Sequence, residues 1–175
     1  MAEQNVVLCG FMGCGKTTVG KRLAALTGAQ FVDMDEYIEQ QAGMTVSAIF
    51  EQFGEADFRR REREACCALA QQSGLVIASG GGALTFPENV QALAATGCVV
   101  LIGVSPATVL QRLEGDTTRP LLARPDKQRA VQELFDRRLP LYRAAADVEV
   151  DGEQTPEVGA AAIAAAAKSF HRNEA

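Results

Sequence analysis

The chain carries one stretch whose glycines and lysine have the spacing of a phosphate-binding loop. Residues 10–17 read Gly-Phe-Met-Gly-Cys-Gly-Lys-Thr, which fits the pattern G-x-x-x-x-G-K-[ST]. Glycines permit backbone conformations that turn N–H groups toward a phosphate, and a helix N-terminus adds partial positive charge. We expect Lys16 to reach the β- and γ-phosphates of a nucleotide and the Thr17 hydroxyl to ligate Mg²⁺. An apolar run before the loop and helical periodicity after it supply the strand and helix that the motif requires.

A second group that could do chemistry is the carboxylate pair Asp33 and Asp35, at the end of the predicted second strand. If the chain stays extended, alternation puts both on one side, at the sheet edge where the phosphate loop also lies. One could hold Mg²⁺ through water and the other could accept a proton from an attacking hydroxyl. The alternative is a helix N-cap and a solvent-facing acid. Ser79 occupies the strand end where a Walker B aspartate is usual, which favours Asp33 as the metal carboxylate.

Three further stretches suit ligand binding. Gly80-Gly81-Gly82 directly follows the third predicted strand and would let a ligand approach the backbone closely, unless it is simply a tight turn. The arginines of residues 58–62 could bind a carboxylate bidentately, and Glu62, three residues after Arg59, could orient that arginine. A solvated basic face is the alternative for Arg60, Arg61 and Arg63. Residues 114–125 form a long predicted loop with Arg119, which suits a lid that closes over ATP and excludes water. A flexible connection is the alternative for this loop.

The elements that must position these residues alternate between strand and helix. Strands are predicted at residues 6–9, 30–33, 75–79, 98–104 and 148–150. Helices are predicted at 16–27, 35–42, 46–53, 55–72, 87–95, 106–113, 126–145 and 156–170, with Pro140 bending or breaking the seventh. Buried strands separated by helices indicate an α/β fold with a parallel sheet between two helical layers.

Composition narrows the class of protein. The 175 residues suit a single domain, and the net charge of −5 argues against a nucleic-acid partner. No apolar run has transmembrane length and no signal peptide is apparent, so we expect a cytoplasmic protein without a membrane partner. The five cysteines show no zinc spacing and are expected to be reduced thiols. Cys9 and Cys98 are predicted to lie in the core, and Cys14 to be a small filler in the phosphate loop rather than a reactive thiol.

Six motifs in order resemble the shikimate kinase family over nearly the whole chain. They are residues 10–20, Phe-Val-Asp-Met-Asp at 31–35, Phe-Arg-Arg-Arg-Glu at 58–62, Gly-Gly-Gly at 80–82, Thr-Arg-Pro-Leu-Leu at 118–122 and Arg-Leu-Pro-Leu-Tyr at 138–142. The phosphate loop alone indicates only nucleotide binding, whereas the ordered set is highly specific. The resemblance implies a P-loop three-layer α/β/α fold, a five-stranded parallel sheet of order 2-3-1-4-5, and a lid near 114–125.

The resemblance also implies roles for individual residues. Asp35 matches the candidate base at the phosphorylated hydroxyl, Arg119 the lid arginine at the ATP phosphates, and Arg112 the residue stacked on adenine. The implied catalytic residues are Asp35, Lys16 and Arg119. The implied nucleotide-binding residues are Gly13, Cys14, Gly15, Lys16, Thr17, Thr18, Arg112 and Arg119. The implied shikimate-binding residues within the substrate-binding segment 34–62 are Asp35, Phe50, Phe58 and Arg59. Those after this segment are Gly81, Gly82 and Arg138. Thr17 and Asp33 are the implied metal ligands.

The expected reaction is transfer of the ATP γ-phosphoryl group to the 3-hydroxyl of shikimate, in aromatic amino-acid synthesis, by a monomer that uses Mg²⁺. Another small-molecule P-loop kinase, for gluconate or a nucleoside monophosphate, is the closest alternative, because gluconate is also a carboxylate. A non-catalytic nucleotide-binding switch is the alternative of a different class. The acid pair Asp33 and Asp35 and the two arginines Arg59 and Arg138 argue against a switch, because a switch has no need of an acceptor pocket.

Overall fold

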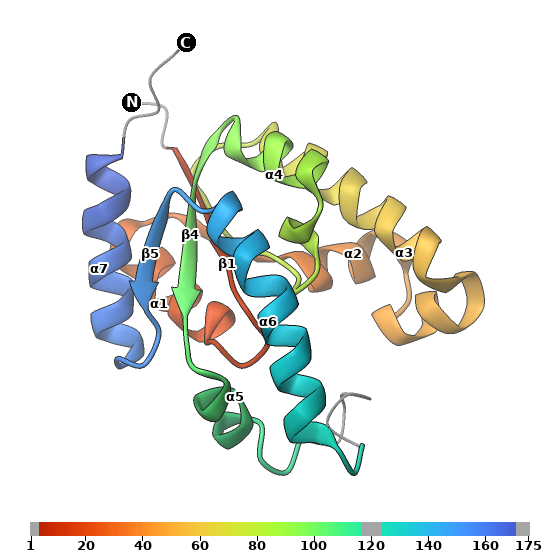
Figure 1. The fold of residues 1–175 in the computed structure, drawn as a ribbon. Coiled ribbons are helices and arrows are strands. Elements are labelled where there is room, and N and C mark those ends of the chain that lie inside the picture. Colours follow the sequence, from red (N-terminus) through yellow and green to blue (C-terminus); the bar gives the residue numbers. More distant parts are fainter. Residues whose placement is uncertain (1–3, 117–123, 171–175) are drawn as a thin grey trace.

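Five parallel strands form the centre of the molecule (Figure 1). The computed structural model describes residues 4–116 and 124–170. The strands are β1 (Asn5–Cys9), β2 (Gln30–Asp33), β3 (Leu75–Ala78), β4 (Gly97–Gly103) and β5 (Val148–Asp151). They lie in the order β2-β3-β1-β4-β5, and every neighbouring pair is parallel. The predicted sheet and its order are therefore confirmed.

Helices cover both faces of the sheet. In Figure 1, α1 (Lys16–Thr27) and α7 (Pro156–Ser169) lie together on one side of it. On the other side are α4 (Pro87–Ala94) and α6 (Lys127–Ala145), with α3 (Val46–Ala70) packed beside α4. The shorter elements α2 (Met34–Ala42), η1 (Ala83–Thr85) and α5 (Pro106–Arg112) connect these layers near the carboxyl ends of the strands. This is the predicted three-layer α/β/α arrangement.

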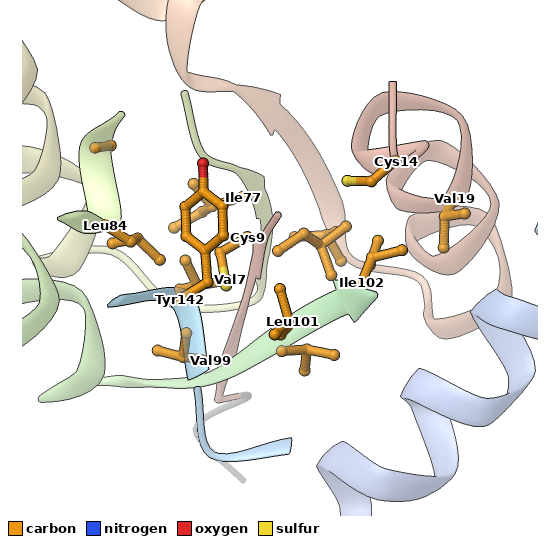
Figure 2. Packing of buried hydrophobic residues seen from close by; sticks show 14 of the residues in the cluster. Val7, Cys9, Cys14, Val19, Ile77, Leu84, Val99, Leu101, Ile102 and Tyr142 are labelled. Atoms are coloured by element: carbon orange, nitrogen blue, oxygen red, sulfur yellow. The ribbon is translucent and has the colours of Figure 1, made fainter. Parts of the chain in front are cut away.

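The core lies on both faces of the central strands. All four residues of β3 are buried, and so are the first six residues of β4. Strands covered by helices on both sides need continuous apolar runs of this kind rather than alternation. Figure 2 shows the apolar side chains that meet around β1 and β4, among them Cys9. Cys9 and Cys98 are fully buried, as predicted, and none of the five cysteines, all of which the structure describes, forms a disulfide.

Two local predictions about helices had different outcomes. The helix predicted to begin at residue 106 does begin there: Pro106 opens α5, and the Ser105 hydroxyl accepts a hydrogen bond from the Thr108 N–H at 3.1 Å. Pro140, in contrast, neither ends nor divides α6, which runs unbroken to Ala145. Pro140 lies on the exposed side of the helix. Water can therefore take the place of the N–H donor that proline lacks, while residues on the other side keep the helix packed.

Candidate active site

The phosphate loop lies between the end of β1 and the start of α1. Gly13 and Gly15 have φ angles of 75° and 100°, in the left-handed region that other residues rarely adopt. Gly15 is also the N-cap of α1, and no side chain caps this helix. The backbone geometry that the motif predicts is thus present, and the N–H groups of the first helical turn open toward the loop, as an anion site requires.

Lys16 and Cys14 lie against the backbone of this loop. The Lys16 ammonium donates to the carbonyl groups of Gly10 at 2.7 Å and Phe11 at 3.2 Å. Cys14 is almost fully buried, and a Cβ atom on Gly10 would come within 2.8 Å of its sulfur. The thiol therefore fills space beneath the loop, which supports its interpretation as a small packing residue.

The two predicted metal ligands are adjacent. The Thr17 hydroxyl donates to Asp33 Oδ2 at 3.1 Å. The other oxygen of Asp33 accepts from the N–H groups of Asp35 at 3.0 Å and Glu36 at 3.4 Å, so Asp33 is also the N-cap of α2. Ser79, at the Walker B position, instead donates to the Leu8 carbonyl within the sheet. Asp33 therefore combines the capping role that the sequence left as an alternative with a place beside Thr17.

The condition for Asp33 and Asp35 to share one side, a chain that stays extended, is not met. The strand ends at Asp33 and the helix begins at Met34, so Asp35 lies in the first turn of α2. The Asp33 cap makes the helix start here, because its carboxylate satisfies N–H groups that the first turn leaves open. The turn directs Asp35 toward Gly80, where a Cβ atom would lie 3.0 Å from Asp35 Oδ1.

A cavity of about 230 Å³ brings together all of the residues predicted to bind shikimate, and we call it the acceptor pocket. They come from α2, α3, the glycine turn after β3, and α6. Its lining residues are Met12, Asp35, Val46, Phe50, Phe58, Arg59, Glu62, Gly80, Gly81, Gly82 and Arg138. Every predicted shikimate-binding residue lines this pocket. Met12, which belongs to the phosphate loop, lines it as well.

Charged side chains dominate the inner wall of the acceptor pocket. Arg59 Nη1 donates to Glu62 Oε2 at 2.9 Å, which confirms that Glu62 orients this arginine. The Glu62 side chain is only 1% exposed. Burial raises the pKa of its carboxyl group, against the lowering effect of Arg59. Glu62 Oε1 and Arg59 Nε are both buried, and neither has a hydrogen-bond partner among the described residues.

The three glycines make room for these charges. A Cβ atom on Gly82 would lie 2.7 Å from Arg59 Nη1, and one on Gly80 would lie 3.1 Å from Glu62 Oε1. None of the three glycines, Gly80, Gly81 and Gly82, has a φ angle in the left-handed region. Other side chains therefore approach Gly80 and Gly82 closely, whereas a Cβ atom on Gly81 would lie at an ordinary contact distance of 3.5 Å from Arg138 Nη1.

Two aromatic rings form the apolar wall of the pocket. The rings of Phe50 and Phe58 are 4.7 Å apart between centroids, as expected for a pair that faces one ligand. Sequence reasoning missed Met12 and Val46 as neighbours of this wall. Val46 precedes Phe50 by one helical turn, so the i, i+4 spacing could have revealed it. Met12 offered no such signal beyond its place in the phosphate loop.

Arg112 lies at the end of α5 beside the phosphate loop. Its guanidinium donates to the carbonyl groups of Gly13 at 3.2 Å and Cys14 at 3.3 Å, and to Gly152 at 2.7 Å. These contacts place it next to the loop that would hold the nucleotide, and stacking on adenine stays a prediction. Arg119, the predicted lid arginine, belongs to residues 117–123, which lie outside the described residues.

Larger cavities elsewhere lack the chemistry of a kinase site. One of about 310 Å³ lies between α2 and α3, and one of about 520 Å³ lies between β4, β5 and α6. Neither is lined by a residue that the sequence assigns to catalysis, binding or a metal. None of the helices within residues 4–116 and 124–170 has the length and apolar character that crossing a membrane requires.

Comparison with known proteins assigns the family. The sequence model of the family described as Shikimate kinase matches residues 12–169. The chain belongs to the shikimate kinase family. Members of this family are ATP-dependent kinases that transfer a phosphoryl group to a hydroxyl of shikimate.

Individual members of the shikimate kinase family are similar over most of their length. The chain is 43% identical to the shikimate kinase of Xanthomonas axonopodis pv. citri over 84% of this chain and 82% of that protein. It is 42% identical to that of Aromatoleum aromaticum over 95% of this chain and 96% of the relative. The structure of the Acinetobacter baumannii shikimate kinase in complex with shikimate superimposes with a TM-score of 0.89 at 38% identity, covering 95% of this chain and 94% of that one.

Proposed function

We propose that this protein transfers the γ-phosphoryl group of ATP to the 3-hydroxyl of shikimate, giving shikimate 3-phosphate and ADP. Family membership supports the substrates. The observation that carries the proposal is the acceptor pocket itself, which opens at the phosphate loop through Met12 and contains two arginines and an aspartate. A carboxylate with several hydroxyl groups is the ligand that such a set of side chains suits best.

The acceptor is held by charge on one side and hydrogen bonds on the other. Arg59 and Arg138 bind the shikimate carboxylate, with Glu62 keeping the Arg59 guanidinium in place. The backbone of Gly81 and Gly82 and the carboxylate of Asp35 bind the hydroxyl groups. The aromatic wall of Phe50 and Phe58 packs against the ring of the acceptor.

The phosphoryl transfer itself needs few groups. The 3-hydroxyl oxygen attacks the γ-phosphorus, the bond from that phosphorus to the β,γ-bridging oxygen breaks, and ADP leaves with the electron pair. Asp35 accepts the hydroxyl proton. Because the transition state is loose, positioning and neutralisation of charge supply most of the acceleration. Lys16 and the N–H groups at the start of α1 supply that charge on the donor side, with Arg119 closing from the segment 114–125.

The pair Thr17 and Asp33 fits a magnesium ion. Both offer oxygen atoms, they lie 3.1 Å apart, and they are beside the phosphate loop. No group of three or more His, Cys, Asp or Glu side chains suited to a metal occurs among the described residues. The ion would therefore complete its coordination with phosphate oxygens and water, which is how Mg²⁺ is commonly held. When bound, it neutralises charge on the β- and γ-phosphates.

The test is a comparison of acceptors. ADP release is measured with ATP and shikimate, gluconate or nucleoside monophosphates, each over a range of concentrations. We expect saturable ADP release with shikimate and none above background with the others. Turnover with gluconate or a nucleotide but not with shikimate would contradict the proposal. Tight ATP binding without turnover on any acceptor would support a nucleotide switch instead.

We further propose that the protein acts as a monomer in the cytoplasm. The five cysteines all lie among the described residues and form no disulfide, which suits a reducing compartment. Light scattering coupled to size-exclusion chromatography should give the mass of one chain, 18.6 kDa, and a dimer mass would contradict the monomer.

A further inference from the structure

One tyrosine below the glycine turn has no part in the reaction described so far. Tyr142 lies in α6 with 2% of its surface exposed, and its ring packs in the main apolar core. Figure 2 shows the ring in this cluster, with the phenol oxygen at the end directed away from Val99. That hydroxyl donates a hydrogen bond to the carbonyl group of Gly81, 61 residues away in the sequence. A buried phenol in the core thus contacts the backbone of the acceptor pocket.

The contact fixes the direction of one peptide unit. The Gly81 carbonyl and the Gly82 N–H belong to the same planar trans peptide and point in opposite directions. Because Tyr142 holds the Gly81 carbonyl, the Gly82 N–H is directed to the opposite side of this peptide, and both glycines line the acceptor pocket.

The glycine turn depends on such outside contacts for its orientation. Gly80, Gly81 and Gly82 have no side chains of their own to pack. The Gly80 carbonyl accepts from the Ala83 N–H at 3.1 Å, and the Gly82 carbonyl accepts from the Thr85 hydroxyl at 2.6 Å. Both of these donors are local, whereas Tyr142 is the donor that ties the turn to a different layer of the molecule.

The same helix also supplies an arginine to the pocket. Arg138 and Tyr142 are four residues apart, so they lie on one side of α6. Burial raises the pKa of the Tyr142 phenol to about 12, although the nearby Arg138 charge acts in the opposite direction. The phenol therefore keeps its proton, and remains a donor to the Gly81 carbonyl, at neutral pH.

We propose that Tyr142 is a positioning residue for the acceptor: its hydroxyl holds the Gly81–Gly82 peptide so that the Gly82 N–H faces a hydroxyl group of the bound substrate. This inference rests on the proposed function. One helix then sets two acceptor contacts at once, Arg138 directly and the Gly82 N–H through Tyr142. Tyr142 itself contacts neither substrate in this proposal and acts through the Gly81–Gly82 peptide. Replacing it should therefore weaken acceptor binding and leave ATP binding unchanged.

The direct test is Tyr142→Phe, which removes one oxygen atom and keeps the ring in the core. The matched control is Tyr37→Phe, which alters the other of the two tyrosines, in α2 and outside the acceptor pocket. We expect the shikimate KM and the shikimate Kd from calorimetry to rise about tenfold in Tyr142→Phe, the effect of losing one hydrogen bond to a positioned group. The ATP KM should stay unchanged, and the control should match the wild type.

A purely structural role would give a different pattern. An unchanged shikimate Kd in Tyr142→Phe, or an equal rise in the ATP KM, would overturn the inference. Failure of the proposed function is seen separately, because the wild type itself would then show no turnover with shikimate.

A second measurement does not depend on the folding of Tyr142→Phe. In the Tyr37→Phe variant, Tyr142 is the only tyrosine, so biosynthetic incorporation of 3-fluorotyrosine labels it alone. We expect the single ¹⁹F NMR resonance to move when shikimate is added and to stay in place with ADP alone. No response to saturating shikimate would overturn the inference.

Discussion

At the scale of single residues, the acceptor pocket is a meeting of charges that the chain keeps far apart in sequence. Asp35, Arg59, Glu62 and Arg138 come from three helices and face one cavity. The Arg59–Glu62 pair is partly buried, so it is screened less by water than the surface pairs of the same helix. Such a set can hold an anionic, hydroxylated ligand in one orientation, which places a hydroxyl at Asp35.

Asp35→Asn tests the role of that carboxylate. The change keeps the size of the side chain and removes its ability to accept a proton, so we expect kcat to fall by about 10²- to 10⁴-fold, the range for general base catalysis. The ATP KM should remain close to that of the wild type. Glu36→Gln, at the next position of α2 and outside the pocket, is the control. A kcat within a few fold of the wild type would show that Asp35 only orients the hydroxyl.

Glu62 gives a prediction about pH. An acid with a higher pKa in the folded chain than in the unfolded chain holds its proton more tightly when folded, so acidification through that window adds stability. Burial raises the pKa of Glu62 above its ordinary value of 4.5. As the pH falls from neutral to 4.5, the free energy of unfolding of the wild type should therefore rise relative to that of Glu62→Gln. Urea denaturation across this range measures it, and a shift in favour of the variant would contradict the direction.

At the scale of elements, the parts that follow from local pattern were predicted well. The bounds of α1 and β2 follow from periodicity, glycines and caps, which are local signals. The order of the strands came from the resemblance to the shikimate kinase family, because no local signal reports which strands are neighbours. Neighbouring structure decided two details differently: Pro140 does not break α6, and α2 begins at Met34, one residue before the predicted start. The contact of Tyr142 with Gly81 was not predictable, because no pattern along the chain reports which carbonyl a distant phenol will meet.

Gly54 makes α3 suitable for the pocket. It has φ 80° and ψ 177°, and it divides α3 so that Phe50 comes back against Phe58. Gly54→Ala should destabilise the protein by about 1–3 kcal/mol, because the alanine must adopt this conformation, and should raise the shikimate KM by displacing Phe50. Gly28→Ala is the control: it also has a positive φ, of 75°, and open space around it, but it ends α1 away from the pocket. Equal effects of both changes on the shikimate KM would contradict this account of α3.

At the scale of the whole molecule, the nucleotide site and the acceptor pocket meet at the carboxyl edge of the sheet. The phosphate loop follows β1, Asp33 ends β2 and the glycine turn follows β3, so neighbouring parallel strands deliver all three to one edge. The layer of α3 and α6 then closes the acceptor pocket from outside the sheet. Donor and acceptor thus have separate walls and a shared boundary at Met12, which predicts that each can be disabled without the other.

Ligand-dependent melting of the whole protein tests this separation. A ligand at a hundred times its Kd stabilises the folded state by about 2.7 kcal/mol, which for a chain of this size raises Tm by about 5–10 °C. Arg138→Ala should abolish most of the rise with shikimate and keep the rise with ATP, whereas Lys16→Ala should do the reverse. Arg137→Ala removes an exposed arginine next to Arg138 and should keep both, which separates loss of a contact from loss of net charge. If Arg138→Ala lowers the two responses equally, the donor and acceptor sites do not have separate walls, because an arginine of one would then be supporting the other.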